Sequence, residues 1–519
     1  MNRNMKKILY TLSFLEGGAV MATELLGVMM MAPYFGSSLY VWASVLAVTL
    51  GGLTCGYFWG GILSERENTK SILFKLTLAG GILLAFMPVT ANFILSNIQG
   101  LDLVPAILFS SILILLPPLV CMGMVSPILI RLLSEVVEES GKIAGRIYAI
   151  STIGGIISTL LMGFYLIPTF GLIRLALIFG LILSIIPLIL LFKKKKALSF
   201  LFIILFSISL LSNFRPSEKS DIKILYKSEG LLGQLMVSDY PVYEKNGEVN
   251  MVRFLFNNRC IQSVYNASAT GNKYLAYILG IANAASIYPK NSKALILGIG
   301  GGGIANEFTK LGFNIDACDL DKRVVYVAKK YFDMDDKVRV IIDDGRHYIR
   351  NCKEKYDILV IDIFQAEINP SHILTKENLD EIESIMEPNG LIIINSPGFI
   401  KDKIGKGVRS VYKTLINNGL KVQVLPTPGP EEDRNILFLA SFKEKDFSKN
   451  RMDDLDIINL HIENRFMPAE QIDSEDAIIL TDDLPVLNIL NRDANRSWRK
   501  GFIESHIREY SQKGIPLFY

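Results

Sequence analysis

Long apolar runs fill the first 214 residues and limit what this part of the chain can fold into. A helix that crosses a lipid bilayer needs about 20 consecutive apolar residues, and about seven runs here are near that length. The first run is too long for a cleaved signal peptide, and a second run follows it closely. The runs cover approximately residues 8–32, 41–63, 71–96, 104–131, 147–168, 172–192 and 197–214. We therefore predict a multi-pass α-helical membrane bundle over residues 1–214.

Lysine and arginine residues lie at alternate ends of these runs, and this pattern predicts the orientation of the bundle. They are Arg3, Lys6, Lys7, Arg66, Lys70, Arg131, Lys142, Arg146 and Lys193–Lys196. Because basic loops stay in the cytoplasm, we predict a cell-membrane protein with a cytoplasmic N-terminus. If the short last run also crosses the bilayer, the rest of the chain lies outside the cell. If that run lies in the membrane interface instead, the rest of the chain is cytoplasmic.

Some residues inside the apolar runs are unusually small or acidic. Gly52, Gly56 and Gly60 form a tandem G-x-x-x-G pattern, which lets two helices approach closely. We interpret it as packing within the bundle, with the interface of a homodimer as the alternative.

Glu16 and Glu24 lie in the first run, where a carboxylate is costly unless it is paired, protonated or facing a cavity. They predict either a hydrogen bond to another helix or a substrate or proton site in the bundle.

The composition excludes several classes of protein. The 5 cysteines are scattered without metal-ligand spacing, so neither a disulfide framework nor a zinc site is expected. The 4 histidines are equally dispersed, and no other metal site is predicted. A net charge of +3 gives no reason to expect a nucleic-acid partner. The hydrophobic share of 50% averages a membrane half with a soluble half.

Residues 215–519 have the pattern of a soluble region with two parts. Residues 215–265 contain strand-like runs at 235–240 and 252–257 around a turn at 245–247, which predicts a small β subdomain. In residues 266–519, apolar strands alternate with helices, which predicts a doubly wound, mostly parallel α/β sheet. Its strands are expected at residues 294–298, 313–319, 338–342, 356–362 and 391–395, with a closing hairpin at 421–425 and 436–441.

A glycine-rich segment follows the first predicted strand of this sheet. Gly298, Gly300 and Gly302 lie between that strand and a helix. Glycines let a ligand approach the backbone closely, and the helix N-terminus presents free N–H groups. Asp319 ends the second strand about 20 residues further on, where such sheets place an acid that accepts hydrogen bonds from ribose hydroxyls.

The next two strands also end in acidic residues. Asp344 and Gly345 follow the third strand, where a carboxylate can accept from an adenine amino group, and Asp362 ends the fourth. Ligands of this fold bind at the carboxyl ends of the strands, so the set predicts a nucleoside site. The missing Walker lysine excludes a P-loop. NAD suits the glycine pattern, but an S-adenosyl compound fits better because of the Asp344-Gly345 step.

At this point the chain resembles a family, the spermidine synthases, and particularly their membrane-fused bacterial branch. In the membrane half the resemblance rests on residues 24–27 (ELLG), 32–38 (APYFGSS), Trp42 and the stretch IYAISTIGG…GFYLIP. In the soluble half it rests on LILGIGGGGIANE, CDLD, DDGRHYI, YDILVIDIF, HILTKENL and LTDDLPV. The resemblance implies an S-adenosylmethionine-type Rossmann domain and no metal.

The family's activity is aminopropyl transfer from decarboxylated S-adenosylmethionine to an amine, with release of methylthioadenosine. The resemblance implies that the loop glycines, Asp319 and the Asp344-Gly345 step bind the nucleoside. It makes Asp362 the general base that deprotonates the attacking amine. The residues expected to line the substrate pocket are Gln234, Gln262, Tyr274, Gln365 and Glu367, the last at a position that is not the family's.

The amine half of the family's site is largely missing. Gly301 stands where the family has an aspartate, Gln365 replaces the second aspartate of its D-x-x-D motif, and Leu275 replaces a histidine. Each charged hydrogen bond to an ammonium is worth about 1.5–3 kcal/mol, so two lost carboxylates weaken a dicationic substrate by about 3–6 kcal/mol. We therefore expect poor turnover of putrescine.

Three functions fit these residues. The main prediction is a membrane-anchored aminopropyltransferase-like enzyme that uses decarboxylated S-adenosylmethionine or a related sulfonium nucleoside. The first alternative is a methyltransferase that uses intact S-adenosylmethionine, because Gly301 removes a carboxylate that would repel the carboxylate of that donor. The second alternative is a transporter-like membrane module with a nucleoside-sensing domain that has no turnover.

Overall fold

The computed structural model describes most of the chain. The described residues are 3–36, 38–98, 101, 103–134, 136–192, 196–213, 222–230, 232–243, 249–266, 275–363, 371–449, 465–484, 486–495 and 497. The chain divides into two compact units, one with the N-terminal helices and residues 228–234, the other with the two β-sheets. The predicted boundary after residue 214 falls outside the described residues.

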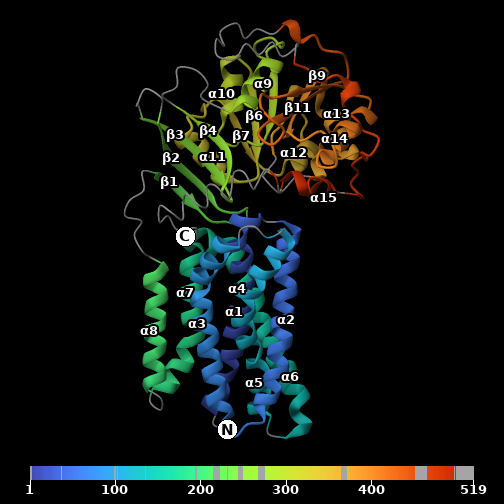
Figure 1. The fold of residues 1–519 in the computed structure, drawn as a ribbon. Helices are drawn as coiled ribbons and strands as arrows, with labels where there is room; N and C mark the ends of the chain where they lie inside the picture. The colour runs from blue at the N-terminus through green and yellow to red at the C-terminus, as the bar shows by residue number, and fades with distance from the viewer. Residues whose placement is uncertain are drawn as a thin grey trace. The chain divides into compact units, whose positions relative to one another are not determined.

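The first unit is a helical bundle around a central helix, α1 (Figure 1). Beyond Leu12, α1 is buried along most of its length, because α6, α7, α4 and α2 pack around it. Its apolar residues therefore face other helices on all sides. The helices are α1 (Arg3–Phe35), α2 (Leu39–Ser64), α3 (Thr69–Asn97), α4 (Leu103–Gly123), α5 (Val125–Leu133), α6 (Ser140–Leu161), α7 (Ile167–Phe192) and α8 (Lys196–Asn213), with a π-helical turn at Met162–Leu166.

By length and composition, 5 helical stretches of the described residues can cross a membrane. The prediction of about seven spans is therefore wrong by this measure. The predicted fifth and sixth runs belong to one helical stretch of 52 residues, Ser140–Leu191, and the apolar part of α8 is limited to Ser199–Ser212. The long stretch is interrupted at Gly171, whose φ of 74° and ψ of 174° are not helical.

Small residues bring the helices of the bundle into close contact. Gly52, Gly56 and Gly60 of α2 face α4 and the start of α5, and a Cβ at Gly56 would lie 2.7 Å from the Cα of Gly123. The G-x-x-x-G pattern thus packs inside the bundle, as we interpreted it.

The buried Glu16 of α1 accepts a hydrogen bond of 3.1 Å from the Ser151 hydroxyl of α6, which is the predicted bond to another helix.

The second unit begins with a four-stranded sheet that the sequence only partly predicted. Its strands follow the order β1 (Lys223–Ser228), β2 (Leu235–Tyr243), β3 (Val249–Asn257) and β4 (Cys260–Tyr265). The pairs β2–β3 and β3–β4 are antiparallel. The predicted turn at 245–247 lies outside the described residues.

The main sheet has 7 strands in the order β10-β11-β9-β8-β5-β6-β7. Five of them, from β9 to β7, run parallel, and β11 and β10 add antiparallel at one edge. This is the predicted doubly wound sheet with its closing hairpin. The strands are β5 (Lys293–Leu297), β6 (Asn314–Asp319), β7 (Arg339–Ile342), β8 (Tyr356–Ile361), β9 (Met386–Pro397), β10 (Lys421–Pro426) and β11 (Asn435–Ser441).

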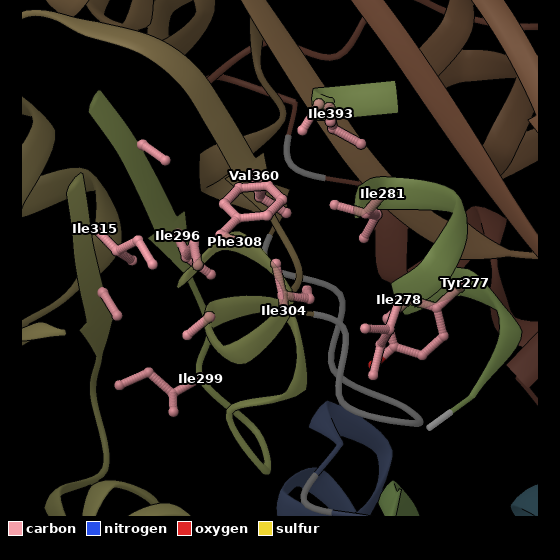
Figure 2. Packing of buried hydrophobic residues seen from close by; sticks show 14 of the residues in the cluster. Tyr277, Ile278, Ile281, Ile296, Ile299, Ile304, Phe308, Ile315, Val360 and Ile393 are labelled. Atoms are coloured by element: carbon pink, nitrogen blue, oxygen red, sulfur yellow. The ribbon is translucent and has the colours of Figure 1, made fainter. Parts of the chain in front are cut away.

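Helices cover both faces of the main sheet and form two hydrophobic cores. Successive residues of β5 alternate between them: Ile296 belongs to one core and Leu297 to the other. Such a strand, buried on both faces, is typical of parallel sheets. Figure 2 shows part of the first core, where Ile304 and Phe308 of α10 lie near Ile296 and Val360. The helices are α9 (Ala276–Ala285), α10 (Gly303–Lys310), α11 (Lys322–Tyr331), α12 (Gly345–Asn351), α13 (Lys376–Ile385), α14 (Lys406–Asn417) and α15 (Leu487–Leu490).

Candidate active site

The strand order places a topological switch point between β5 and β8. From β5 the chain proceeds through β6 to β7 on one side, and β8 then pairs with β5 on its other side. Ligands of open α/β sheets bind outside the carboxyl ends of the strands at such a point. Gly298 follows β5 and Asp362 follows β8, so both predicted residues lie at the switch point.

The glycine loop adopts a backbone that only glycine takes without strain. Gly298, Gly300 and Gly302 have φ values of 89°, 52° and 77°. A Cβ on Gly298 would overlap the carbonyl oxygen of Asp362, since the two strand ends touch here. Gly302 precedes the first turn of α10, whose N-terminal N–H groups are thereby presented at the carboxyl end of the sheet. These three predicted residues therefore shape one loop beside Asp362.

Asp319 joins this loop to the end of β6. One carboxylate oxygen accepts from the N–H of Ile299 at 2.9 Å, and the other accepts from the N–H of Asp321 at 2.9 Å. Burial raises the pKa of Asp319 above its ordinary value. Each carboxylate oxygen has a second lone pair, so Asp319 can fix the loop and still accept a hydrogen bond from a ribose hydroxyl.

Asp344 caps the N-terminus of α12 with one carboxylate oxygen, and its other carboxylate oxygen lies close to a histidine. Oδ1 accepts from the N–H groups of Arg346 and His347 at 3.0 Å each, and Oδ2 lies 3.3 Å from Nε2 of His372. Burial opposes ionisation, but the N–H of His347 and the nearby His372 keep the pKa of Asp344 below its ordinary value. The carboxylate stays ionised at neutral pH and remains an acceptor at the predicted adenine position.

Arg346 links this segment to two distant parts of the chain. Its buried guanidinium donates to both oxygens of Glu381 on α13, at 3.0 and 2.8 Å, and to both oxygens of Asp482, at 2.6 and 2.7 Å. A third contact reaches the carbonyl oxygen of His372 at 3.0 Å. The motifs DDGRHYI, HILTKENL and LTDDLPV, which are far apart in the sequence, therefore meet at one bidentate arginine.

Asp362 is held by two side chains that come from different elements. Its Oδ1 accepts from the Asn395 amide of β9 at 2.8 Å, and its Oδ2 accepts from the Tyr277 hydroxyl of α9 at 3.2 Å. Burial raises the pKa of Asp362 to about 6. A carboxylate with this pKa is mostly ionised at neutral pH and is more basic than an exposed aspartate, so it is suited to accept a proton from a bound substrate.

The activity should therefore fall at acidic pH. If Asp362 is the base, kcat/KM decreases about tenfold per pH unit below pH 6, where the free enzyme binds a proton at this carboxylate. Above that pH the contribution of Asp362 is constant. Initial rates measured from pH 4.5 to 8.5 test this, and a profile that stays flat down to pH 5 would contradict the assignment.

Tyr277 offers a way to move this profile. Replacement of Tyr277 by Phe removes the hydroxyl that stabilises the ionised carboxylate and leaves the ring in its core position. We expect the acidic limb of the pH profile to move to higher pH, with about a 3–30-fold loss of kcat at pH 7 and little change in nucleoside affinity. Tyr288→Phe is the matched control, because that hydroxyl donates to the carbonyl oxygen of Asn389 instead. An unchanged profile in Tyr277→Phe would mean that the 3.2 Å contact does not influence the base.

The predicted substrate residues are only partly described by the structure. Gln262 lies on β4, and its neighbour Ser263 accepts from the N–H of Gly301 at 2.8 Å, so β4 contacts the glycine loop. Gln234 donates to Oε1 of Glu229 at 2.6 Å within the segment that groups with the bundle. The predicted substrate residues Tyr274, Gln365 and Glu367 lie outside the described residues.

Sequence reasoning missed Tyr277, Asn395 and His372. Asn395 is a polar residue at the carboxyl end of an apolar strand, the same signal that identified Asp319 and Asp362. Tyr277 gives no such signal, because it lies in an apolar helix and only the packing of α9 directs its hydroxyl to β8. Among the described residues no group of three or more His, Cys, Asp or Glu side chains could hold a metal ion.

Comparison with known proteins identifies the relatives of this unit. Residues 274–453 match the model of the spermine/spermidine synthase domain. A probable polyamine aminopropyl transferase of Bifidobacterium longum is 24% identical over 216 residues, which are 38% of this chain and 48% of that protein. A polyamine aminopropyltransferase of Thermoplasma volcanium is 34% identical over 134 residues, 24% of this chain and 49% of that protein. The chain thus spans about half the length of these curated relatives.

A solved structure is also similar. The spermidine synthase of Thermotoga maritima aligns with 53% of this chain and 87% of its own, with 15% identity and a TM-score of 0.35.

Proposed function

Residues 274–453 form a spermidine synthase-like domain, and we propose that the chain is a membrane-anchored transferase of the aminopropyltransferase type. The donor is decarboxylated S-adenosylmethionine or a related sulfonium nucleoside, and the acceptor is an amine. The observation that carries the proposal is the Asp362 cluster. A carboxylate with a raised pKa lies at the switch point, in contact with the glycine loop and held by Tyr277 and Asn395.

The reaction needs little covalent chemistry from the protein. The lone pair of the amine forms a C–N bond at the carbon next to the sulfonium, the C–S bond breaks, and its electron pair goes to sulfur. Neutral methylthioadenosine leaves, and the surplus proton of the amine passes to Asp362. Since the sulfonium is already an activated electrophile, most of the rate comes from positioning and from this proton transfer.

The donor is held by the residues at the strand ends. The loop of Gly298, Gly300 and Gly302 and the N-terminus of α10 contact the nucleoside, Asp319 accepts from the ribose, and Asp344 accepts from the adenine amino group. Support comes from the positions of these groups at the carboxyl ends of β5, β6 and β7. The membrane part is supported by 5 helical stretches that are long and apolar enough to cross a bilayer.

The acceptor differs from putrescine in this proposal. Gly301 has no carboxylate for an ammonium, and an added Cβ there would lie 2.9 Å from the Cβ of Ser263, which fills the adjacent space. Because about 3–6 kcal/mol of binding is missing for a dication, putrescine should bind two to four decades more weakly than it does to a site with both carboxylates.

The test is a transfer assay with the full chain in detergent or nanodiscs. The donor is decarboxylated S-adenosylmethionine labelled in the aminopropyl group, and the acceptors are putrescine, longer polyamines and monoamines. We expect label in an amine other than putrescine, with an equimolar amount of methylthioadenosine. Methyl transfer from intact S-adenosylmethionine would establish the methyltransferase alternative instead, and nucleoside binding without any transfer would establish the sensor.

A further inference from the structure

The contacts between the helices fix the direction of each helix in the bundle. Along α1 and α6, the Ser13 hydroxyl donates to the carbonyl oxygen of Ile147 at 3.1 Å, and the Ser151 hydroxyl donates to Glu16 at 3.1 Å. Gly18 then lies beside Ser158. Residue numbers increase together on both helices, so α1 and α6 are parallel.

The direction of α3 follows from its contacts with α1. Its end lies near the end of α1, where the Tyr34 and Ser96 hydroxyls are 3.5 Å apart, and its start clusters with Leu9 and Leu12 of α1. Helix α3 is therefore parallel to α1. Helix α7 is antiparallel to α3, because Gly81 faces Ser184 while Ala85 faces Gly180.

It follows that α6 and α7 run in opposite directions, although they belong to one helical stretch. The chain must reverse between them, and Gly171 is the residue with a non-helical φ of 74° at that place. A positive φ of this kind is adopted readily by glycine and breaks the helix there.

Helix α8 runs along α3 rather than across it. Phe202 near its start belongs to the same cluster as Leu73 and Phe74 at the start of α3. Further along, the Ser209 hydroxyl donates to the carbonyl oxygen of Ala85 at 2.6 Å. Helix α8 is thus parallel to α3 and ascends beside it. With 18 residues it is about 27 Å long, although its apolar part is only Ser199–Ser212, and we take α8 to cross the bilayer as well.

One face of the bundle therefore collects the start of α1, the α2–α3 turn, the α5–α6 turn and the α7–α8 turn. A single hydrophobic cluster confirms this for residues of α1, α3, α5, α6, α7 and α8, which meet there. All the basic groups that the sequence analysis singled out, from Arg3 to Lys196, belong to these segments. We call it the basic face.

The connections between helices on the opposite face of the bundle are poor in basic residues. Those at residues 36–38, 98–102 and 162–171 contain no Lys or Arg in the sequence, and the nearest basic residues are Arg174 of α7 and Arg215 and Lys219, which follow α8. Since positive charge in short loops marks the cytoplasmic side, the basic face is cytoplasmic. Acidic residues in the same loops have little influence on the orientation of a bundle in the membrane.

The end of α8 lies on the face opposite the basic face, and the α/β unit follows from there in the chain. The eight intervening residues, 214–221, include Arg215, Glu218, Lys219 and Asp221. A segment with this many charges does not cross hydrocarbon. We propose that the α/β unit lies on the extracytoplasmic side of the membrane, so that its nucleoside and amine substrates are drawn from outside the cytoplasm.

An extracytoplasmic α/β unit is the first of the two locations that the sequence left open, and it has a chemical consequence. Nucleoside donors are made where ATP is available, so a reaction or carrier that delivers the donor across the membrane must precede this enzyme. The location itself does not depend on the proposed activity.

The test compares two single-cysteine variants of an otherwise cysteine-free full chain. Glu444 is exposed after β11, and Glu67 is exposed in the α2–α3 turn on the basic face. In spheroplasts, a membrane-impermeant maleimide should label Glu444→Cys and not Glu67→Cys. After permeabilisation both should label. Any other pattern in the intact spheroplasts, including labelling of both positions or of Glu67→Cys alone, overturns the proposal.

A second measurement uses the unaltered sequence, in case the cysteine-free chain does not fold. Proteinase K added to spheroplasts should remove a C-terminal epitope tag while a cytoplasmic marker protein survives. Survival of the tag until the membrane is permeabilised would place the α/β unit inside and overturn the proposal.

Discussion

Replacement of Asp362 by Asn should reduce turnover by about 10²–10⁴-fold, the range expected when a general base is removed. The substitution keeps the size of the side chain and an oxygen that can accept from the Asn395 amide, so the fold should not change. Affinity for methylthioadenosine should stay within about threefold of the unaltered protein, because the base contacts the amine and not the nucleoside. Initial rates and calorimetric titration of the full chain measure the two quantities separately.

Asp357→Asn is the matched control for this variant. Asp357 lies at the beginning of β8, at the other end of the strand that Asp362 follows, and accepts from the N–H of Lys293 at 2.9 Å. An asparagine there can still accept this hydrogen bond, so turnover should be unaffected. If Asp362→Asn were as active as the control, Asp362 would not be the base and the proposed mechanism would be lost.

Replacement of Gly298 by Ala should abolish both nucleoside binding and turnover. The new Cβ would require a side chain at a φ of 89° and would overlap the Asp362 carbonyl oxygen, so the glycine loop and the end of β8 must separate. Strain and displacement together should cost about 2–4 kcal/mol of unfolding free energy. Thermal unfolding and titration with methylthioadenosine check the two effects.

Gly419→Ala separates backbone strain from damage to the site. Gly419 follows α14 with a φ of 77°, and a Cβ there would meet nothing within 4 Å. This variant should lose about 1–2 kcal/mol of stability and keep its nucleoside affinity. If Gly298→Ala bound methylthioadenosine as well as Gly419→Ala does, the glycine loop would not be part of the nucleoside site.

The parallel sheet could be predicted well because its signals are local. Each strand is a short apolar run that ends in a polar or glycine residue, and the structure places β5, β6, β7 and β8 within a residue or so of the expected positions. The first sheet was predicted less fully. Strands β1 and β4 contain few apolar residues in alternation, and they are fixed by pairing with β2 and β3 instead.

The partners of the site residues could not be predicted, because they come from distant parts of the chain. Tyr277 reaches Asp362 across 85 positions, and Asp482 reaches Arg346 across 136. Nothing in the local sequence of either residue shows such a pairing. In the bundle, hydropathy separated the runs at 147–168 and 172–192, with Gly171 between them, but it did not show which helices pack together, such as α1 and α6.

In the proposed function the α/β unit binds a sulfonium nucleoside or its product at the carboxyl ends of β5, β6 and β7. Calorimetric titration of the full-length protein in nanodiscs with methylthioadenosine and with decarboxylated S-adenosylmethionine tests it most directly. We predict saturable one-site binding of both compounds, retained in Asp362→Asn and lost in Gly298→Ala. A folded, full-length protein that binds neither compound would mean that the α/β unit has no nucleoside site.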